Sequence, residues 1–131
     1  LRDSEVTREV IENFNLILLG SPSKNLLIKD LIPKTPAKQN AHGIKLDGKH
    51  FKGKLSLAMI YPNPLNAQKM VAFLTGNSEK MERLSLYALP LYSGSGIPHY
   101  MIFDLEVKQY GWGGVRAAGF FNEQGKPEKE F

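Results

Sequence analysis

The stretch from Asn15 to Asn25, NLILLGSPSKN, constrains the fold of this chain more than any other. Its unbroken apolar run over 16–19 is typical of a strand buried on both faces, at the centre of a sheet covered by helices. Gly20 permits a sharp turn, and Ser21-Pro22 has the chemistry of a helix N-cap followed by proline at the first helical position. The stretch therefore predicts a strand, a tight turn and a helix over 22–31, which together form half of a βαβ unit.

The same pattern occurs a second time. An apolar strand over 70–74 leads into Gly76 and Ser78, and a helix is expected over 78–88. Two such units predict an α/β fold: a three-layer α/β/α sandwich around a mixed, mostly parallel sheet of the Rossmann or flavodoxin-like kind. One exception is expected. The connection between the strands at 55–61 and 70–74 is too short for a crossover helix, so one of these two strands runs antiparallel to the rest.

The remaining segments complete this prediction. Asp47-Gly48 is a favoured two-residue hairpin turn, so 44–51 predicts a β-hairpin at the edge of the sheet, with Ile44 and Phe51 on one face. The other expected elements are a helix over 5–13, strands over 55–61, 100–103 and 115–121, a loop over 91–98, a turn over 109–114 and a loose polar tail over 122–131.

Length and composition limit the classes of function. With 131 residues, the chain predicts a single α/β domain over 1–131. No apolar stretch is long enough to span a bilayer, so no membrane partner is expected. The absence of cysteine excludes disulfides and thiolate zinc sites. The three histidines (His42, His50 and His99) are far apart without ligand-like spacing, so we expect no metal and no cofactor.

Positive charge is concentrated in one part of the chain, whose net charge is +4. Residues 24–54 contain eight lysines and two aspartates, which would suit an acidic partner or nucleic acid. The same block has no arginine, a single aromatic residue (Phe51) and no nucleic-acid motif. A solvated, lysine-rich face is therefore favoured, and no nucleic-acid partner is expected.

No motif in the sequence predicts catalysis. The nucleophile elbow G-x-S-x-G and the phosphate-loop patterns are absent. Ser21, His99 and Asp104 could be combined on paper into a hydrolytic triad, but nothing in their spacing supports it. We therefore predict no catalytic residue.

Ligand-binding residues are predicted in the loops, because ligands of open α/β sheets usually bind outside the carboxyl ends of the strands. A helix N-terminus after Gly20 would also attract a phosphate or carboxylate weakly. Asp104, directly after an apolar strand, suits a site residue or a helix cap. The asparagines between prolines suit side-chain bonds within their loop. The candidates are Gly20, Ser21, Ser23, Asn25, Asn63, Gly76, Ser78 and Asp104.

Several stretches together resemble a known family. They are residues 15–25, residues 60–66 (IYPNPLN), and residues 100–104 with 117–121. They resemble the C-terminal accessory domain of large bacterial prolyl-oligopeptidase-like proteins and related α/β-hydrolase esterases, and YPNPLN is the most specific part. The resemblance implies a three-layer α/β domain without activity of its own. It also implies a partner, the catalytic hydrolase domain upstream in the same polypeptide, and slightly favours a periplasmic or secreted location.

The sequence departs from that family at its start. The family's domain usually begins with another strand and helix before the position of Asp3, and these are absent here. The resemblance therefore implies a fragment of a longer multidomain chain that lacks its first strand and helix. A position in the sheet would then be open or filled by a second molecule, which makes a homodimer of the fragment one expected outcome.

Three functions stay open on the sequence alone. The favoured one is a non-catalytic accessory domain that packs on or assists the catalytic domain of a serine hydrolase, which predicts an apolar patch on an outer face. The alternative is a stand-alone domain that binds a small ligand or an anion at the carboxyl ends of the strands, which predicts a cleft with converging polar groups. Nucleic-acid binding through the lysine-rich half is the least favoured and predicts a steep salt dependence.

Overall fold

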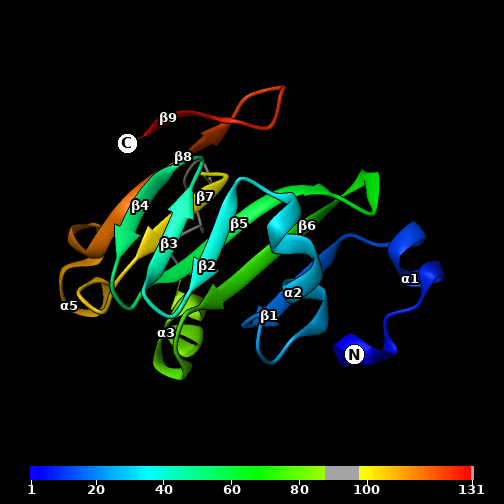
Figure 1. The fold of residues 1–131 in the computed structure, drawn as a ribbon, viewed down its shortest axis with the longest axis horizontal. Coiled ribbons are helices and arrows are strands. Elements are labelled where there is room, and N and C mark those ends of the chain that lie inside the picture. Colours follow the sequence, from blue (N-terminus) through cyan, green and yellow to red (C-terminus); the bar gives the residue numbers. More distant parts are fainter. Residues whose placement is uncertain (88–97, 131) are drawn as a thin grey trace.

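The computed structural model describes residues 1–87 and 98–130 (Figure 1). In this part of the chain six strands form one mixed sheet, in the order β1-β6-β5-β7-β8-β9, and three form a second sheet, β2-β3-β4. The strands are β1 (Leu16–Gly20), β2 (Ala37–Asn40), β3 (Gly43–Leu46), β4 (Lys49–Lys52), β5 (Ser56–Asn63), β6 (Asn66–Gly76), β7 (Tyr100–Phe103), β8 (Val115–Phe121) and β9 (Pro127–Glu130). The helices are α1 (Arg8–Asn13), α2 (Leu26–Leu31), α3 (Glu79–Leu84) and α5 (Val107–Tyr110), with 3₁₀ turns η1 (Asp3–Glu5), η2 (Ile32–Lys34), η3 (Ser85–Tyr87) and η4 (Gly111–Gly114).

The expected three-layer α/β/α sandwich with a mostly parallel sheet is wrong. In the larger sheet only β1 and β6 are parallel, and every other described pair is antiparallel. No described α-helix exceeds six residues, so none can form a helical layer across the sheet. The cause is local: α2 ends just before Pro33, and the chain that follows folds into the small sheet instead of a longer helix.

The core is divided by the large sheet. On one face of the sheet lie α2 and the small sheet (Figure 1). They cover side chains of β1, β6, β5 and β7. The largest fully buried members of this cluster are Tyr100, Phe73, Ile28, Leu31, Ile44, Leu55 and Leu57. On the other face, α3 and α5 cover a smaller cluster, whose members are Ala58, Leu74, Met81, Leu84, Met101, Phe103, Val107 and Ala118.

Strand β1 is at the edge of the large sheet and not at its centre. Its side chains alternate: Leu16 and Leu18 are buried, whereas Ile17 and Leu19 are 67% and 52% exposed. The expectation of a strand buried on both faces is therefore wrong. The reason is that the cluster under α3 and α5 includes no residue of β1, so that face of the strand stays open.

The hairpin at 44–51 is confirmed as β3 and β4. Asp47 and Gly48 both have positive φ, 46° and 88°, as a tight two-residue turn requires. Ile44 pairs directly with Phe51. The hairpin belongs to the second sheet, however, and does not extend the edge of the large one. The expected antiparallel pair is also confirmed, because β5 and β6 form one hairpin.

The helices are shorter than expected. The predicted helix over 5–13 consists of η1 and α1, with Thr7 as the N-cap of α1. The helix expected from Pro22 begins at Leu26 instead, because Asn25 and not Ser21 is its N-cap. The helix expected over 78–88 is α3 followed by η3, and Ala88 lies outside the described residues. Ser78 is confirmed as its N-cap.

Strands β7 and β8 coincide with the predicted ranges 100–103 and 115–121. The polar tail is not loose throughout, because residues 127–130 form β9 and pair with β8. The predicted turn at 109–114 is taken up by the end of α5 and by η4. The expected loop at 91–98 lies outside the described residues except for Pro98. No helix in the described ranges is long and apolar enough to cross a membrane.

Candidate functional site

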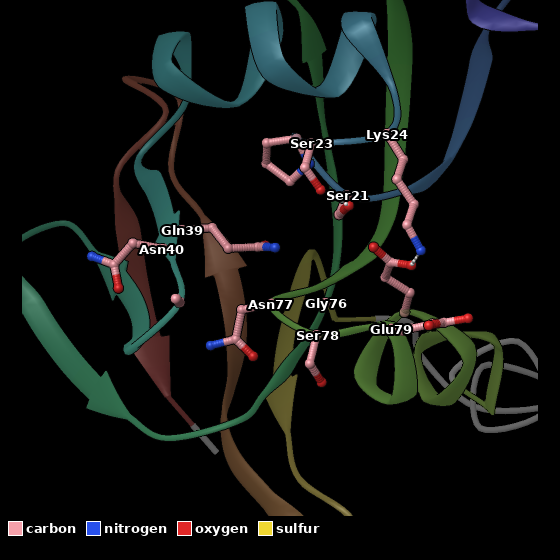
Figure 2. A pocket seen from close by; sticks show the side chains of 12 residues that line it. Ser21, Ser23, Lys24, Gln39, Asn40, Gly76, Asn77, Ser78 and Glu79 are labelled. Carbon is pink, nitrogen blue, oxygen red and sulfur yellow. Dashed lines mark hydrogen bonds and ion pairs between the residues drawn. The ribbon is translucent and has the colours of Figure 1, made fainter.

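A cleft of about 410 Å³ opens where β1 and β6 end side by side. Its walls come from the segment between β1 and α2, from β2, and from the turn between β6 and α3, as Figure 2 shows. Because β1 and β6 are the one parallel pair described, their carboxyl ends meet at this edge of the sheet. The cleft is therefore where an open parallel sheet would place a ligand, although most of this sheet is antiparallel.

The floor of the cleft is held by Gly76, Asn77 and Ser78. A Cβ on Gly76 would lie 2.3 Å from the carbonyl carbon of Met81, so only glycine lets β6 approach α3 this closely. Ser78 Oγ accepts the N–H of Met81 and caps α3. The side chain of Asn77 is bonded at both ends to the segment between β4 and β5. These contacts fix the backbone of the floor before any ligand arrives.

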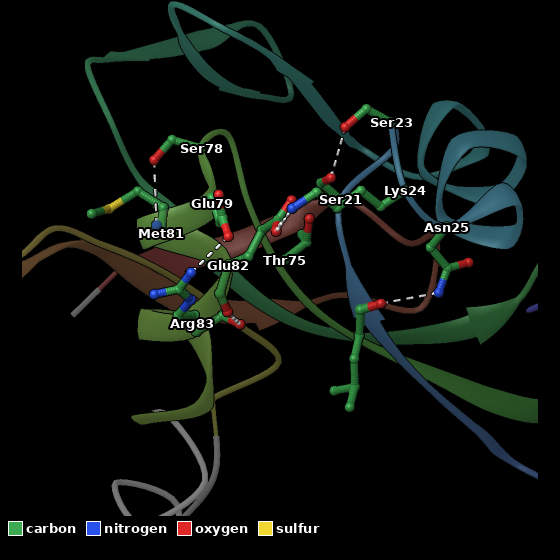
Figure 3. Close-up of polar contacts among 12 residues, drawn as sticks. Ser21, Ser23, Lys24, Asn25, Thr75, Ser78, Glu79, Met81, Glu82 and Arg83 are labelled. Carbon is green, nitrogen blue, oxygen red and sulfur yellow. Dashed lines mark hydrogen bonds and ion pairs between the residues drawn. The ribbon is translucent and has the colours of Figure 1, made fainter. Parts of the chain in front are cut away.

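Two serine hydroxyls form the upper wall. Ser21 Oγ and Ser23 Oγ are 3.0 Å apart, and Ser21 is buried (Figure 3). The carbonyl of Ser21 accepts the N–H groups of Lys24 and Asn25, which gives the loop a fixed turn. Only one of the two hydroxyls can donate to the other at a time. The pair therefore keeps one hydroxyl hydrogen that can be given to a bound molecule.

Gln39 of β2 contributes an amide to the opposite wall (Figure 2). Its Nε2 donates to Thr75 Oγ1 at 3.3 Å. Its Oε1 is buried and has no hydrogen-bond partner within the described ranges. Buried amide oxygens nearly always accept a hydrogen bond in native proteins, so this one marks a place for a donor.

The charged groups of the cleft are already paired. Lys24 Nζ lies 3.0 Å from a carboxylate oxygen of Glu82. Glu79 accepts a hydrogen bond from Arg83 at 2.6 Å, and this bond, with the charges of Lys24 and Arg83, lowers the pKa of the Glu79 carboxyl (Figure 3). Lys24 therefore has two carboxylates as neighbours, and the cleft presents no unpaired cation among the lining residues.

The structure brings together four of the predicted ligand residues: Ser21, Ser23, Gly76 and Ser78 line the cleft. Gly20 and Asn25 support it from outside. Gly20 turns the chain with a φ of 118°. Asn25 caps α2 with its Oδ1 and holds the carbonyl of Leu19 with its Nδ2.

The other two candidates lie elsewhere. Asn63 is at the far end of β5, in the turn to β6. Asp104 follows β7, where its Oδ1 accepts the N–H of Glu106 and its Oδ2 is 2.8 Å from Nε of Arg116. Asp104 therefore serves as a turn and ion-pair residue. Sequence reasoning missed Gln39, because no hydrophobic alternation in the segment after Pro36 indicates a strand.

The combination of Ser21, His99 and Asp104 is not assembled. Ser21 follows the edge strand β1, while Asp104 follows β7, with β6 and β5 between those two strands. His99 precedes β7 and accepts the N–H of Phe121 with its Nδ1. Within the described residues, no group of histidine, aspartate and glutamate side chains could hold a metal ion.

No protein-family model matches the chain, and no curated protein or solved structure matches it either. The resemblance to accessory domains of hydrolases therefore stays a prediction. Its implied fold, the three-layer sandwich, is not the fold observed. The function has to be inferred from the geometry of the cleft.

Proposed function

We propose that this domain binds a small, uncharged molecule with hydroxyl or amide groups in the cleft at the carboxyl ends of β1 and β6. The observation that carries the proposal concerns Gln39, a residue that lines the cleft: its buried Oε1 has no partner in the described part of the chain. A hydroxyl or amide hydrogen of a ligand would satisfy this oxygen. The spare hydrogen of the Ser21–Ser23 pair would be donated to an oxygen of the same molecule.

The charge of the cleft favours an uncharged ligand over an anion. Lys24 is paired with Glu82, and Glu79 is a second carboxylate in the lining. A phosphate or carboxylate would have to displace Glu82 from Lys24 and would then lie near two negative charges. A polyol or an acetamido sugar can bind the Lys24–Glu82 pair without breaking it, because its hydroxyls both donate and accept.

The test is an NMR titration of the ¹⁵N-labelled protein. N-acetylglucosamine supplies both hydroxyl and amide groups, and glucose 6-phosphate is the anionic comparison. We expect N-acetylglucosamine to shift the signals of Ser21, Gln39 and Asn77 in a saturable way, and glucose 6-phosphate to bind more weakly. Equal or tighter binding of the phosphate at these residues would contradict the proposal, as would the absence of any saturable shift.

A matched pair of variants assigns binding to the cleft. Gln39→Met removes the free acceptor, together with the bond from Nε2 to Thr75, and keeps the length of the side chain. We expect it to weaken binding about tenfold, the usual cost of one hydrogen bond to the ligand. Gln68→Met makes the same change at an exposed position of β6 outside the cleft and should bind normally. Should Gln39→Met fail to fold, Ser23→Ala tests the opposite, exposed wall with little risk to folding. Normal binding by the folded cleft variant would refute the assignment.

A second candidate function is the non-catalytic accessory domain of a serine hydrolase. One observation favours it: Ile17 and Leu19 expose an apolar strip on the open face of β1, as a domain that packs on a neighbour would need. The test compares esterase and peptidase activity of this chain with that of a longer piece of the same polypeptide. Activity only in the longer piece, lowered by Ile17→Lys there, would support this candidate. Activity of this chain alone would contradict it.

A further inference from the structure

A second cavity of about 410 Å³ lies at the opposite end of the large sheet from the cleft. Its walls come from the turn between β5 and β6, from the turn between β8 and β9, and from His99 and Lys34. It includes most of the YPNPLN segment, which the proposed function does not use. Within the described ranges of the chain, the unpartnered polar group of this cavity is a hydrogen-bond donor, whereas that of the cleft is an acceptor.

Asn63 is the most unusual residue of this cavity. It is only 1% exposed, and its Oδ1 accepts the N–H of Leu65 at 2.9 Å. Since a backbone N–H can only donate, this bond fixes which end of the amide is oxygen. The Nδ2 at the other end is buried and has no acceptor among the residues that the structure describes. A buried amide donor without an acceptor is rare in native proteins and indicates a missing partner.

His99 supplies a second donor. The N–H of Phe121 donates to His99 Nδ1 at 2.9 Å, so Nδ1 carries no hydrogen. The neutral ring therefore carries its hydrogen on Nε2 and can donate from there. The lining also contains one cation, Lys34, and one carboxylate, Glu123. The donors Asn63 Nδ2 and His99 Nε2 thus favour a ligand that accepts hydrogen bonds.

The remaining wall is apolar and rigid. Tyr61 and Phe121 contact each other edge to face, with ring centres 5.1 Å apart. The hydroxyl of Tyr61 donates its hydrogen to the carbonyl of Gly125, so toward a ligand this residue offers its ring and no hydrogen-bond donor. Pro62 and Pro64 have no N–H group. An aromatic or aliphatic body would pack against this wall.

We propose that this second cavity binds a small molecule made of an apolar ring or chain that ends in a carbonyl or carboxylate oxygen. The oxygen accepts from Asn63 Nδ2 and His99 Nε2, and the apolar body packs on Tyr61 and Phe121. Lys34 and Glu123 in the lining balance each other in charge. The chemistry that is recognised is therefore the acceptor oxygen, which a free acid and an amide share.

Three probes of one size test the proposal in an NMR titration of the ¹⁵N-labelled protein. Phenylacetate and phenylacetamide carry the acceptor oxygen, and phenethylamine carries the same ring with donors only. We expect the side-chain NH₂ signals of Asn63 and the ring signals of His99 to shift with at least one of the first two and not with the third. The tighter of the two binders tells whether the acid or the neutral carbonyl is the better ligand. Equal binding of all three, or no shift at Asn63 with any, would overturn the proposal.

Two matched variants separate binding from folding. Asn63→Asp keeps an oxygen for the N–H of Leu65 and replaces the free donor by an acceptor oxygen. Because the new carboxylate is charged, the uncharged probe is compared, and we expect the folded variant to bind phenylacetamide at least about tenfold more weakly. Asn66→Asp makes the same change in the same turn outside the cavity lining and should leave probe binding intact. Unchanged binding by Asn63→Asp would overturn the proposal. If that variant does not fold, the Asn63 and His99 signals of the unaltered protein decide the question.

Discussion

The backbone N–H of Leu55 donates to Oδ1 of Asn77 across 2.8 Å, and this bond attaches the start of β5 to the floor of the cleft. The Nδ2 of the same side chain donates to the carbonyl of Gly53 at 2.7 Å. One asparagine thus joins the small sheet, the large sheet and the turn into α3. The contribution of Asn77 to the free energy of unfolding can be measured without any ligand.

Replacing Asn77 by alanine is expected to lower the free energy of unfolding by about 2 kcal/mol, because two backbone groups lose their partners. Asn77→Asp keeps the bond from Leu55 but places a carboxylate oxygen against the carbonyl of Gly53, so at neutral pH it should cost at least as much as alanine. Urea denaturation of both variants measures the difference. An alanine variant as stable as the unaltered protein would show that water replaces both bonds without cost.

Gly76→Ala should be among the most damaging single substitutions in the chain. The added Cβ would meet the carbonyl carbon of Met81 at 2.3 Å and the nitrogen of Glu82 at 2.4 Å. Both are backbone atoms in the middle of α3 and cannot turn aside. We expect a loss of about 3 kcal/mol or failure to fold, measured by thermal and urea unfolding. A stable variant would mean that α3 can move away from β6.

Because exposure alternates along β1, we expect two adjacent residues to contribute very differently to the free energy of unfolding. Leu18 is buried, whereas Ile17 is 67% exposed. Leu18→Ala is expected to cost about 3 kcal/mol of unfolding free energy. Ile17→Ala should change it by less than about 1 kcal/mol, because little buried contact is lost. Equal costs at the two positions in a urea denaturation would mean that the open face of β1 is covered in solution.

The lowered pKa of Glu79 can be tested by titration. The largest cause is the hydrogen bond from Arg83, followed by the positive charges of Lys24 and Arg83. Since the folded pKa is depressed, the pair stabilises the protein at neutral pH, and this is lost as the pH falls through the folded pKa. The contribution is small, because both side chains are exposed.

Arg83→Gln is therefore expected to raise the pKa of Glu79 toward its ordinary value, observed by NMR titration of the side-chain carboxyl carbon. Arg8→Gln removes an arginine from another exposed ion pair, on α1, and serves as the control. A Glu79 pKa that does not respond to Arg83→Gln would contradict the assigned cause.

Local signals in the sequence located most strands, but they did not show which strands pair with each other in the sheet. The ranges of β7 and β8 follow from their apolar runs, and the Asp47-Gly48 turn follows from its residue types alone. Whether Ile17 is buried depends on what packs on it, and a short apolar run reads the same at the edge as at the centre of a sheet. The burial of Ile17 therefore depends on long-range pairing and packing, of which the local sequence carries no sign.

The lining of the cleft was predicted only in part, because local signals locate some of its residues and long-range pairing places the others. Ser21, Ser23, Gly76 and Ser78 each follow a recognisable strand and turn, so their shared location could be inferred from parallel pairing of β1 and β6. Gln39 reaches the cleft through the small sheet, which the sequence indicated only by its hairpin. The second cavity joins Asn63, at the end of β5, and His99, just before β7, and only the observed topology places them together.

The parallel pairing of β1 with β6 places residue 16 beside residue 71, so docking of β1 has to close the whole chain between them and is expected to be slow. A strand held along one edge only is also expected to open first in native-state hydrogen exchange. The cleft exists only while β1 is docked. A molecule bound there would therefore slow the exchange of amides along the whole of β1, including amides that it does not touch.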